Sequence, residues 1–240
     1  FSSGGLADRC RVSGNIASEN GGGAGLVNGG QLRNCVVDQN AAYGVGGGGG
    51  VMFQNGGSAV NCTIVTNTAS PGNVCGVWFY GNGRCTNTIV HSNGDNNWGV
   101  VVEGHMDYCC TSPAFPSGAG NVSGDPRFFY PFSGIYRLAS SSPCVDQGQN
   151  SDWMAGGVDV EGRARIHNLI VDMGAYELVS NAGDSDGDGQ SDEDEVTAGV
   201  HPYDANSFFH AQSASRAAGH EMALQWSGAV QRLYSVYYTT

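Results

Sequence analysis

A short pattern that returns at a nearly constant interval restricts the fold more than any other feature of the sequence. The pattern begins with a small side chain, has an aliphatic residue two places later, and has an asparagine five places after its start. Its four copies begin at Cys10, Cys35, Cys62 and Thr88. A period in the range of about 20–50 residues is typical of solenoid proteins, in which each copy stacks on the next.

The residues between the copies indicate short strands and tight turns. A second aliphatic run follows in every repeat, beginning at Gly25, Gly50, Gly76 and Gly99. The chain has 39 glycines and no collagen triplet, a composition that favours an all-β fold with many turns. Residues 1–178 are therefore predicted to form a right-handed parallel β-helix whose coils stack about 4.8 Å apart.

Stacked rows of residues follow from this repeat. Two rows are predicted to face the interior, namely Cys10, Cys35, Cys62 and Thr88, and then Leu26, Val51, Val77 and Val100. A third row is predicted to form amide hydrogen bonds along the axis, at corners of left-handed backbone, and consists of Asn15, Asn40, Asn67 and Asn93. The expected disulfide formers, with their pairing left open, are Cys75, Cys85, Cys109, Cys110 and Cys144.

Four further motifs carry a resemblance to a known family. They are Asp125–Phe128, Tyr136–Gly148, Asp159–Arg163, and Val171–Glu177 with the sequence Val-Asp-Met-Gly-Ala-Tyr-Glu. In this order they resemble the C-terminal region of bacterial, secreted, pectin-lyase-like β-helix proteins. The resemblance implies the fold and an extracellular location, and it implies hardly anything about activity.

Residues 184–195 form a dense acidic loop with the spacing of an EF-hand. Oxygen donors stand at loop positions 1, 3, 5, 7, 9 and 12, and glycine stands at position 6. The predicted calcium ligands are Asp184, Asp186, Asp188, the Gln190 carbonyl, Asp192 and Glu195. The loop also resembles the calcium repeats of dockerins and thrombospondin type 3 segments. Because one loop is present where a dockerin has two, we expect a structural Ca²⁺ clamp rather than a docking module.

The chain divides into three predicted parts. The β-helix covers residues 1–178, the calcium loop and linker cover 179–206, and a C-terminal β segment covers 207–240. In that last segment, Met222–Trp226 and Leu233–Tyr238 alternate as two strands around Gly228. An isolated hairpin is only marginally stable, so these strands are expected to pack on the helix or to belong to a small sheet domain.

Charge and hydropathy exclude two classes of partner. The ten basic residues, all arginine, face 22 acidic residues for a formal charge of −12, so a nucleic-acid groove is not expected. No stretch approaches the roughly 20 apolar residues that span a bilayer, so no membrane partner is expected. The even cysteine count is compatible with a secreted protein. Self-association through an open coil near Phe1 is a further expectation.

A candidate sugar platform lies on the second strand of the third repeat. Because side chains alternate along a strand, Val77 and Phe79 are expected to face inward while Trp78 and Tyr80 face outward. The carbohydrate-binding residues predicted from this arrangement are Trp78, Tyr80, Gln54, Glu103 and Trp98. The alternative is that a loop or the C-terminal strands cover the aromatic pair.

The catalytic interpretation needs groups that the sequence does not supply together. Lyases on this scaffold typically need a basic residue beside an acidic calcium site, and hydrolases need converging carboxylates, for which Asp38, Glu103 and Asp107 are the nearest candidates. We therefore expect no catalytic residues. The prediction is a non-catalytic module that binds plant cell-wall polysaccharide, with xylan first, because the chain is similar to the few β-helical binding modules of xylanases. The alternatives are a divergent polysaccharide lyase or hydrolase and a structural adhesin segment.

Overall fold

The structure is a computed structural model that describes residues 4–129, 131, 134–179, 183–207, 211–216 and 222–226, the last two ranges by backbone alone. The chain forms two compact units, Phe1–Val179 and Ser180–Thr240. Among the described residues, no helix is both long and apolar enough to cross a membrane.

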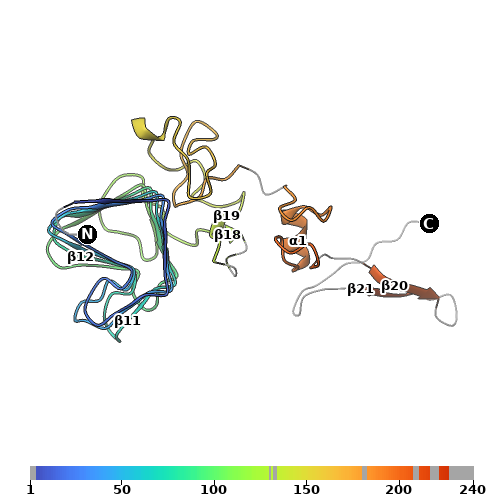
Figure 1. The fold of residues 1–240 in the computed structure, drawn as a ribbon, viewed down its shortest axis with the longest axis horizontal. Coiled ribbons are helices and arrows are strands. Elements are labelled where there is room, and N and C mark those ends of the chain that lie inside the picture. Colours follow the sequence, from blue (N-terminus) through green and yellow to red (C-terminus); the bar gives the residue numbers. More distant parts are fainter. Residues whose placement is uncertain are drawn as a thin grey trace. The chain divides into compact units, whose positions relative to one another are not determined.

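The first unit contains a parallel β-solenoid, which confirms the predicted fold class. Its coils, blue to green in Figure 1, lie over one another. Sheet 1 consists of β1 (Leu6–Asp8), β5 (Gln31–Arg33), β9 (Ser58–Val60), β13 (Gly83–Thr86) and β16 (Gly104–Asp107). Sheet 2 consists of β2 (Arg11–Ser13), β6 (Val36–Asp38), β10 (Thr63–Val65), β14 (Ile89–His91) and β17 (Cys110–Thr111). Sheet 3 consists of β3 (Ile16–Ala17), β7 (Ala41–Ala42) and β11 (Thr68–Ala69). Sheet 4 consists of β4 (Ala24–Val27), β8 (Val51–Gln54), β12 (Val77–Tyr80) and β15 (Trp98–Val100).

The coils differ in length in one part of the circuit only. The number of residues from a strand of sheet 4 to the next strand of sheet 2 is the same in every coil. The register positions that show this are Ala24 to Val36, Val51 to Thr63, Val77 to Ile89 and Trp98 to Cys110. The number of residues from a strand of sheet 2 to the next strand of sheet 4 differs in every coil. The corresponding positions are Arg11 to Ala24, Val36 to Val51, Thr63 to Val77 and Ile89 to Trp98. The second of these is the longest and the last is the shortest. We call this second part of the circuit the variable arc.

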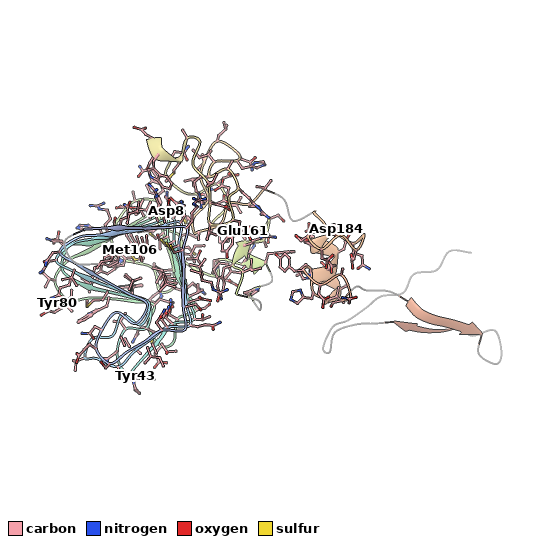
Figure 2. All side chains as sticks on the ribbon, in the orientation of Figure 1. Asp8, Tyr43, Tyr80, Met106, Glu161 and Asp184 are labelled. Atoms are coloured by element: carbon pink, nitrogen blue, oxygen red, sulfur yellow. The ribbon has the colours of Figure 1, made fainter. Side chains whose placement is uncertain are left out.

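The predicted inward rows are confirmed in the middle coils and corrected at their ends. Cys35, Cys62 and Thr88 are fully buried, whereas Cys10 in the first coil is exposed. The second row was misaligned, because the strands of sheet 4 do not start at equal distances from their glycines. The observed rows are Ala24, Val51, Val77 and Trp98, and then Leu26, Phe53 and Phe79, while Val100 at the end of the second row is exposed. Figure 2 places the buried Met106 within the coils.

The asparagine row forms the predicted ladder. The side-chain amides of Asn15, Asn40 and Asn67 each donate over 2.9 Å to the carboxamide oxygen of the next coil, and the last acceptor is Asn93. The left-handed backbone lies one residue earlier than expected, at Gly14, Gln39, Thr66 and Ser92. A second asparagine row at positive φ, which the repeat analysis missed, is Asn34, Asn61 and Asn87.

Residues 112–124 close one end of the solenoid. Phe115 enters the interior cluster and packs against Phe79 and Trp98, with ring centroids 5.9 and 4.8 Å away. Val122 bridges Cys110 in parallel and so covers the edge of β17. At the other end, the first-coil strands are the terminal strands of their sheets, and Leu6 and Ile16 are exposed.

Residues 134–179, here called the returning segment, pack on the outside of sheet 2. The segment contains β19 (Arg137–Leu138), which pairs antiparallel with β18 (Phe128–Phe129), and a short 3₁₀ helix, Asp152–Met154. Its Asp-Met-Gly-Ala-Tyr-Glu motif lies against the coils, because the Ala175 amide donates to Thr63 Oγ1 and the Gly174 amide donates to the Asn87 carbonyl. The family-like motifs therefore fasten this segment to the solenoid.

The second unit contains one helix and one hairpin among its described residues. The helix α1 (Asp192–Ala198) begins after Ser191, whose hydroxyl accepts from the Asp194 amide, and ends at Gly199 in the left-handed conformation. The strand β21 (Met222–Trp226) was predicted, but its partner is β20 (Ala211–Arg216) in antiparallel pairing. The predicted strand at Leu233–Tyr238 lies outside the described residues.

Candidate functional site

A groove of about 690 Å³ lies over sheet 4 and beside the variable arc. Its floor comes from β8, β12 and β15, and its wall comes from the turns that precede β8 and β12. Side chains that line the groove include Val45, Asn73, Met52, Gln54, Trp78 and Tyr80. The groove therefore exists because neighbouring coils carry arcs of different length at this corner.

Trp78 forms the covered part of the groove. Its side chain points outward from β12, as predicted, since Val77 and Phe79 on either side are fully buried in the core. The residue is nevertheless only 8% exposed. The turn at Gly46 lies so close to the indole that a Cβ atom on Gly46 would overlap the ring. The expected pair of exposed aromatic rings is thus corrected for Trp78, because a longer arc in the preceding coil covers it.

Side-chain amides hold this covering turn in place. Asn73 Oδ1 accepts from the Gly46 amide over 3.3 Å, and Asn73 Nδ2 donates to the Gly44 carbonyl over 3.0 Å. Asn20 Oδ1 accepts from the Gly47 amide over 3.1 Å. Three successive arcs are therefore bonded to one another, which fixes the wall of the groove against the Trp78 ring.

Tyr80 is the open aromatic surface of the groove. It is 44% exposed, and its ring centroid lies 5.2 Å from that of Trp78 with an interplanar angle of 43°. Figure 2 shows Tyr80 on the periphery of the coils. Gln54 lies directly opposite Tyr80 in the next strand, and its side chain makes no hydrogen bond within the described residues. An aromatic face beside a free amide suits a ligand that is apolar on its faces and hydroxylated at its edges.

Two of the predicted carbohydrate-binding residues lie outside the groove. Trp98 pairs with Val77, packs on Phe115 and donates from Nε1 to the Pro113 carbonyl over 2.9 Å, so its ring helps to close the solenoid. Glu103 follows β15, is exposed, and meets His105 Nε2 at 3.1 Å. The misaligned fourth strand explains both placements, because the structure puts Val101 rather than Glu103 beside Tyr80.

The groove carries no charged side chain among its described lining residues. The residues that repeat analysis missed there, Val45, Asn73 and Val74, come from the arcs, where no repeated pattern marks them. Val45, Val100 and Val101 are exposed at its margin, at 90, 42 and 56%. A contiguous apolar margin of this kind usually marks a contact surface.

The acidic groups considered for catalysis occupy separate environments. Asp38 is fully buried beneath the returning segment, where its carboxylate accepts from Arg11 over 2.7 Å and from Tyr136 Oη over 3.0 Å. Asp107 in sheet 1 pairs with Arg84 at 2.9 Å. Each of these carboxylates is already neutralised by a structural partner, and neither lines the groove.

A second candidate site is the loop 184–195 of the other unit. Carboxylate oxygens of Asp184, Asp186 and Asp188 lie within 4.8 Å of one another, and Figure 2 labels Asp184 beside α1. The backbone of the loop folds around the Asp184 carboxylate. Its oxygens accept hydrogen bonds from the amides of Gly187 over 2.7 Å and Gly189 over 2.8 Å. This is a backbone arrangement that turns several acidic side chains toward one centre.

Four carboxylate oxygens in this loop have no hydrogen-bond partner among the described residues although they are buried. They are Asp186 Oδ2, Asp188 Oδ2 and both Oε atoms of Glu195, a residue with 0% exposure. Burial and the neighbouring aspartates raise the pKa of Glu195 to about 7. Buried acceptors without donors are unfavourable unless a cation or a proton satisfies them, so these oxygens fit a hard divalent cation.

The two remaining predicted ligands behave differently. The Asp192 carboxylate accepts hydrogen bonds from the Ser185 amide over 2.7 Å and from the Ser185 hydroxyl over 2.6 Å. It therefore connects the start of the loop to the first turn of α1. The Gln190 amide donates to Asp188 over 2.8 Å, which places Gln190 between the acidic residues and α1. Ligation by the Gln190 carbonyl stays a prediction.

Comparisons with known proteins found no matching family model, no matching curated protein and no matching solved structure. The resemblance to pectin-lyase-like proteins therefore stays a prediction in everything beyond the parallel β-solenoid itself.

Proposed function

We propose that the chain binds a neutral polysaccharide in the groove over sheet 4 and does not cleave it. One observation carries the proposal: an exposed Tyr80 ring beside the edge of Trp78 and the unbonded Gln54 amide, with no charged side chain among the described lining residues. Pyranose rings present apolar C–H faces to aromatic rings and hydroxyl groups to amides. A polyuronate would find no cation in such a groove.

The proposed ligand class is a plant cell-wall glycan, with xylan first, and the proposed setting is extracellular. The choice of xylan rests on the similarity to β-helical binding modules stated above. The neutral lining supports this choice over acidic pectins, because carboxylates taken out of water need a paired charge.

Binding without cleavage is favoured over lyase or hydrolase activity by the placement of the charged groups. Glycoside hydrolysis needs two carboxyl groups on either side of the scissile bond, about 5–9.5 Å apart. Asp38 and Asp107 lie on different sheets in ion pairs with arginine. The strand arginines Arg11, Arg33 and Arg84 are each paired with an aspartate, so they are poorly suited to act as a lyase base.

The test is affinity electrophoresis on xylan, neutral β-glucans and pectin, with reducing-end and unsaturated-product assays on the same samples. The full chain is expected to be retarded by a neutral β-linked polymer and to release no product. Tyr80→Ala is expected to weaken retention about 5- to 150-fold, the equivalent of roughly 1–3 kcal/mol for a contact residue at the centre of an interface.

Tyr43→Ala is the matched control, since Tyr43 is 59% exposed and lies outside the groove lining. Equal retention of wild type and Tyr80→Ala would remove the groove from consideration. Product formation that is lost in Glu103→Gln would favour the enzyme alternative, and the absence of retention on every glycan would favour a structural adhesin segment.

We further propose that loop 184–195 binds one Ca²⁺ through Asp184, Asp186, Asp188 and Glu195. The four buried, unpartnered carboxylate oxygens carry this proposal. Oxygen donors at this spacing suit Ca²⁺, which accepts six to eight such ligands. The ion would supply the positive charge that the loop lacks. It would also offset the repulsion among the acidic side chains in the first turn of α1.

Isothermal titration with CaCl₂, paired with thermal unfolding, tests the calcium proposal. Calcium at 100 times its Kd is expected to stabilise the second unit by about 2.7 kcal/mol. Asp188→Ala is expected to abolish binding, whereas Glu193→Gln, which removes an exposed charge from the same loop, is expected to leave it nearly unchanged. Identical unfolding in calcium and in chelator would contradict the proposal.

A further inference from the structure

Two buried thiols meet where the returning segment crosses the last coil. Cys110 belongs to β17, and Cys144 follows β19 in the returning segment. Both residues are 0% exposed, and both belong to one apolar cluster with Ile89, Leu138 and Met173. This cluster lies on the outer side of sheet 2, separate from the cluster that fills the interior of the solenoid.

The backbone holds both thiols in place. The Cys110 amide donates to the Thr88 carbonyl over 3.1 Å, as part of the ladder of sheet 2. The Cys144 amide donates to Ser142 Oγ over 3.1 Å, and its carbonyl accepts from the Met173 amide over 3.0 Å. The proximity of the Cys110 thiol and the burial of the site together raise the pKa of Cys144.

The neighbouring Cys109 faces the other way. Successive residues of a strand point to opposite sides, and Cys109 accordingly belongs to the interior cluster with Phe115 and Met106. Its thiol donates to the Asp107 carbonyl over 3.3 Å. Of the two adjacent cysteines, Cys110 is therefore the one that meets Cys144.

Cys35 and Cys62 also contact each other, but their geometry is less suitable for a covalent bond. They immediately precede the paired strands β6 and β10, and neighbouring parallel strands lie about 4.8 Å apart. Disulfides need Cβ atoms about 3.5–4.5 Å apart. Cys144, in contrast, approaches Cys110 from a segment that is not bound by this spacing.

We propose that Cys110 and Cys144, which are free thiols in the structure, form a disulfide that fastens the returning segment to the last coil. The oxidant is a low-molecular-weight disulfide such as oxidised glutathione. One cysteine thiolate attacks it and forms a mixed disulfide, releasing one thiol, and the second cysteine then displaces the other thiol. Two cysteine S–H bonds are lost, one S–S bond forms, and the two electrons reduce the oxidant to two thiols.

The cross-link closes the loop of chain between Cys110 and Cys144, which includes β18 and β19. Closure of such a loop restricts the unfolded chain and stabilises the folded unit. The bond would secure the cluster beneath the returning segment, which otherwise depends on contacts and hydrogen bonds. An oxidising extracellular location, as proposed above, would supply the conditions, although the test does not depend on it.

The experiment is folding of the full chain in a glutathione redox buffer, alkylation of free thiols, trypsin cleavage and mass spectrometry without reduction. The expected product links the peptide that contains Cys110 to the one that contains Cys144. Because Cys85 and Cys109 lie in the same tryptic peptide as Cys110, three variants assign the bond. Cys110→Ser is expected to abolish the linked peptide, and Cys85→Ser and Cys109→Ser are expected to retain it.

Thermal unfolding gives a second measurement on the same samples. Reduction with dithiothreitol is expected to lower the Tm of the wild type by about 5–10 °C. The same treatment is expected to leave the Tm of Cys110→Ser nearly unchanged. A linked peptide that persists in Cys110→Ser, or free Cys110 and Cys144 after oxidation, would overturn the assignment.

Discussion

The carboxamide of Asn40 donates to Asn67 Oδ1 over 2.9 Å, and the Asn40 backbone amide donates to the same oxygen over 3.0 Å. One side-chain oxygen thus satisfies two donors of the neighbouring coil. Asn67→Ala removes the shared acceptor, and of the two buried donors only the Asn40 side chain keeps another one, the Val12 carbonyl, so we expect a loss of about 2–4 kcal/mol in the free energy of unfolding. This loss is measured by urea denaturation, with unfolding monitored by circular dichroism.

Asn15→Ala is the control within the same ladder. Asn15 is exposed, and its side chain donates to Asn40 but accepts no hydrogen bond from another coil among the described residues, so its loss is expected to cost less than about 1 kcal/mol. Equal destabilisation by the two substitutions would mean that the ladder does not act through buried donors.

Glu177 is expected to make the stability of the first unit depend on pH. The carboxylate is buried beside Arg165, Asp172 and Asp159, and burial together with the charge of Asp172 raises its pKa to about 7. The folded state therefore holds this proton more tightly than the unfolded state. Its contribution to stability is full below about pH 4.5 and is lost as the pH rises through about 7.

We therefore expect the free energy of unfolding to fall by about 1–2 kcal/mol between pH 5.5 and pH 8. Glu177→Gln, which stays neutral, is expected to remove this part of the slope. Denaturation of both proteins at the two pH values, in saturating calcium so that the acidic loop does not contribute, compares the slopes. Parallel curves would show that Glu177 does not titrate in this range.

Gly46→Ala is expected to disturb the groove without loss of the fold. Its new Cβ atom would overlap the Trp78 ring, and its φ of 113° is unfavourable for alanine. The covering turn must move, so the intrinsic fluorescence and the glycan retention are both expected to change. Gly72→Ala is the matched control, because Gly72 also lines the groove at positive φ but has open space around its Cβ position. Equal effects of the two would indicate backbone strain rather than contact with Trp78.

Glu195→Gln is expected to stabilise the second unit without calcium and to weaken its stabilisation by calcium. In chelator it removes one negative charge from a group of neighbouring carboxylates, so the second unit should become more stable. In calcium it removes a charged ligand, so affinity should fall at least tenfold. Differential scanning calorimetry in both conditions measures the two signs, and a uniform loss of stability would contradict the assignment of Glu195.

The sequence predicted best those features in which the deciding residues are near one another or recur at a fixed spacing. The asparagine ladder follows from its period, and the acidic loop lies within one continuous segment, 184–195. The rows of sheet 4 were misaligned, because Gly99 and Gly25 stand at different places in their strands. A sequence repeat predicts which residues pair between neighbouring coils only where the coils have the same number of residues.

The groove was harder to predict because its wall is not part of the repeat. The alternation along β12 correctly placed Trp78 outward, but its burial depends on a turn one coil earlier that is held by Asn20 and Asn73. Cys110 and Cys144 were both named as expected disulfide formers, but which cysteine each one meets could not be predicted. The two residues are distant in the sequence and belong to segments with no common period.

The variable arc has a consequence for how such a protein can evolve. Insertions and deletions in its later part, after the asparagine ladder and sheet 3, reshape the groove and leave the constant return path, the strand register and the ladder untouched. Elsewhere in the coil, a single added residue would turn inward side chains outward. The shape of the groove is thus free to diversify by changes of length at one corner, while the rest of the circuit is confined to point substitutions.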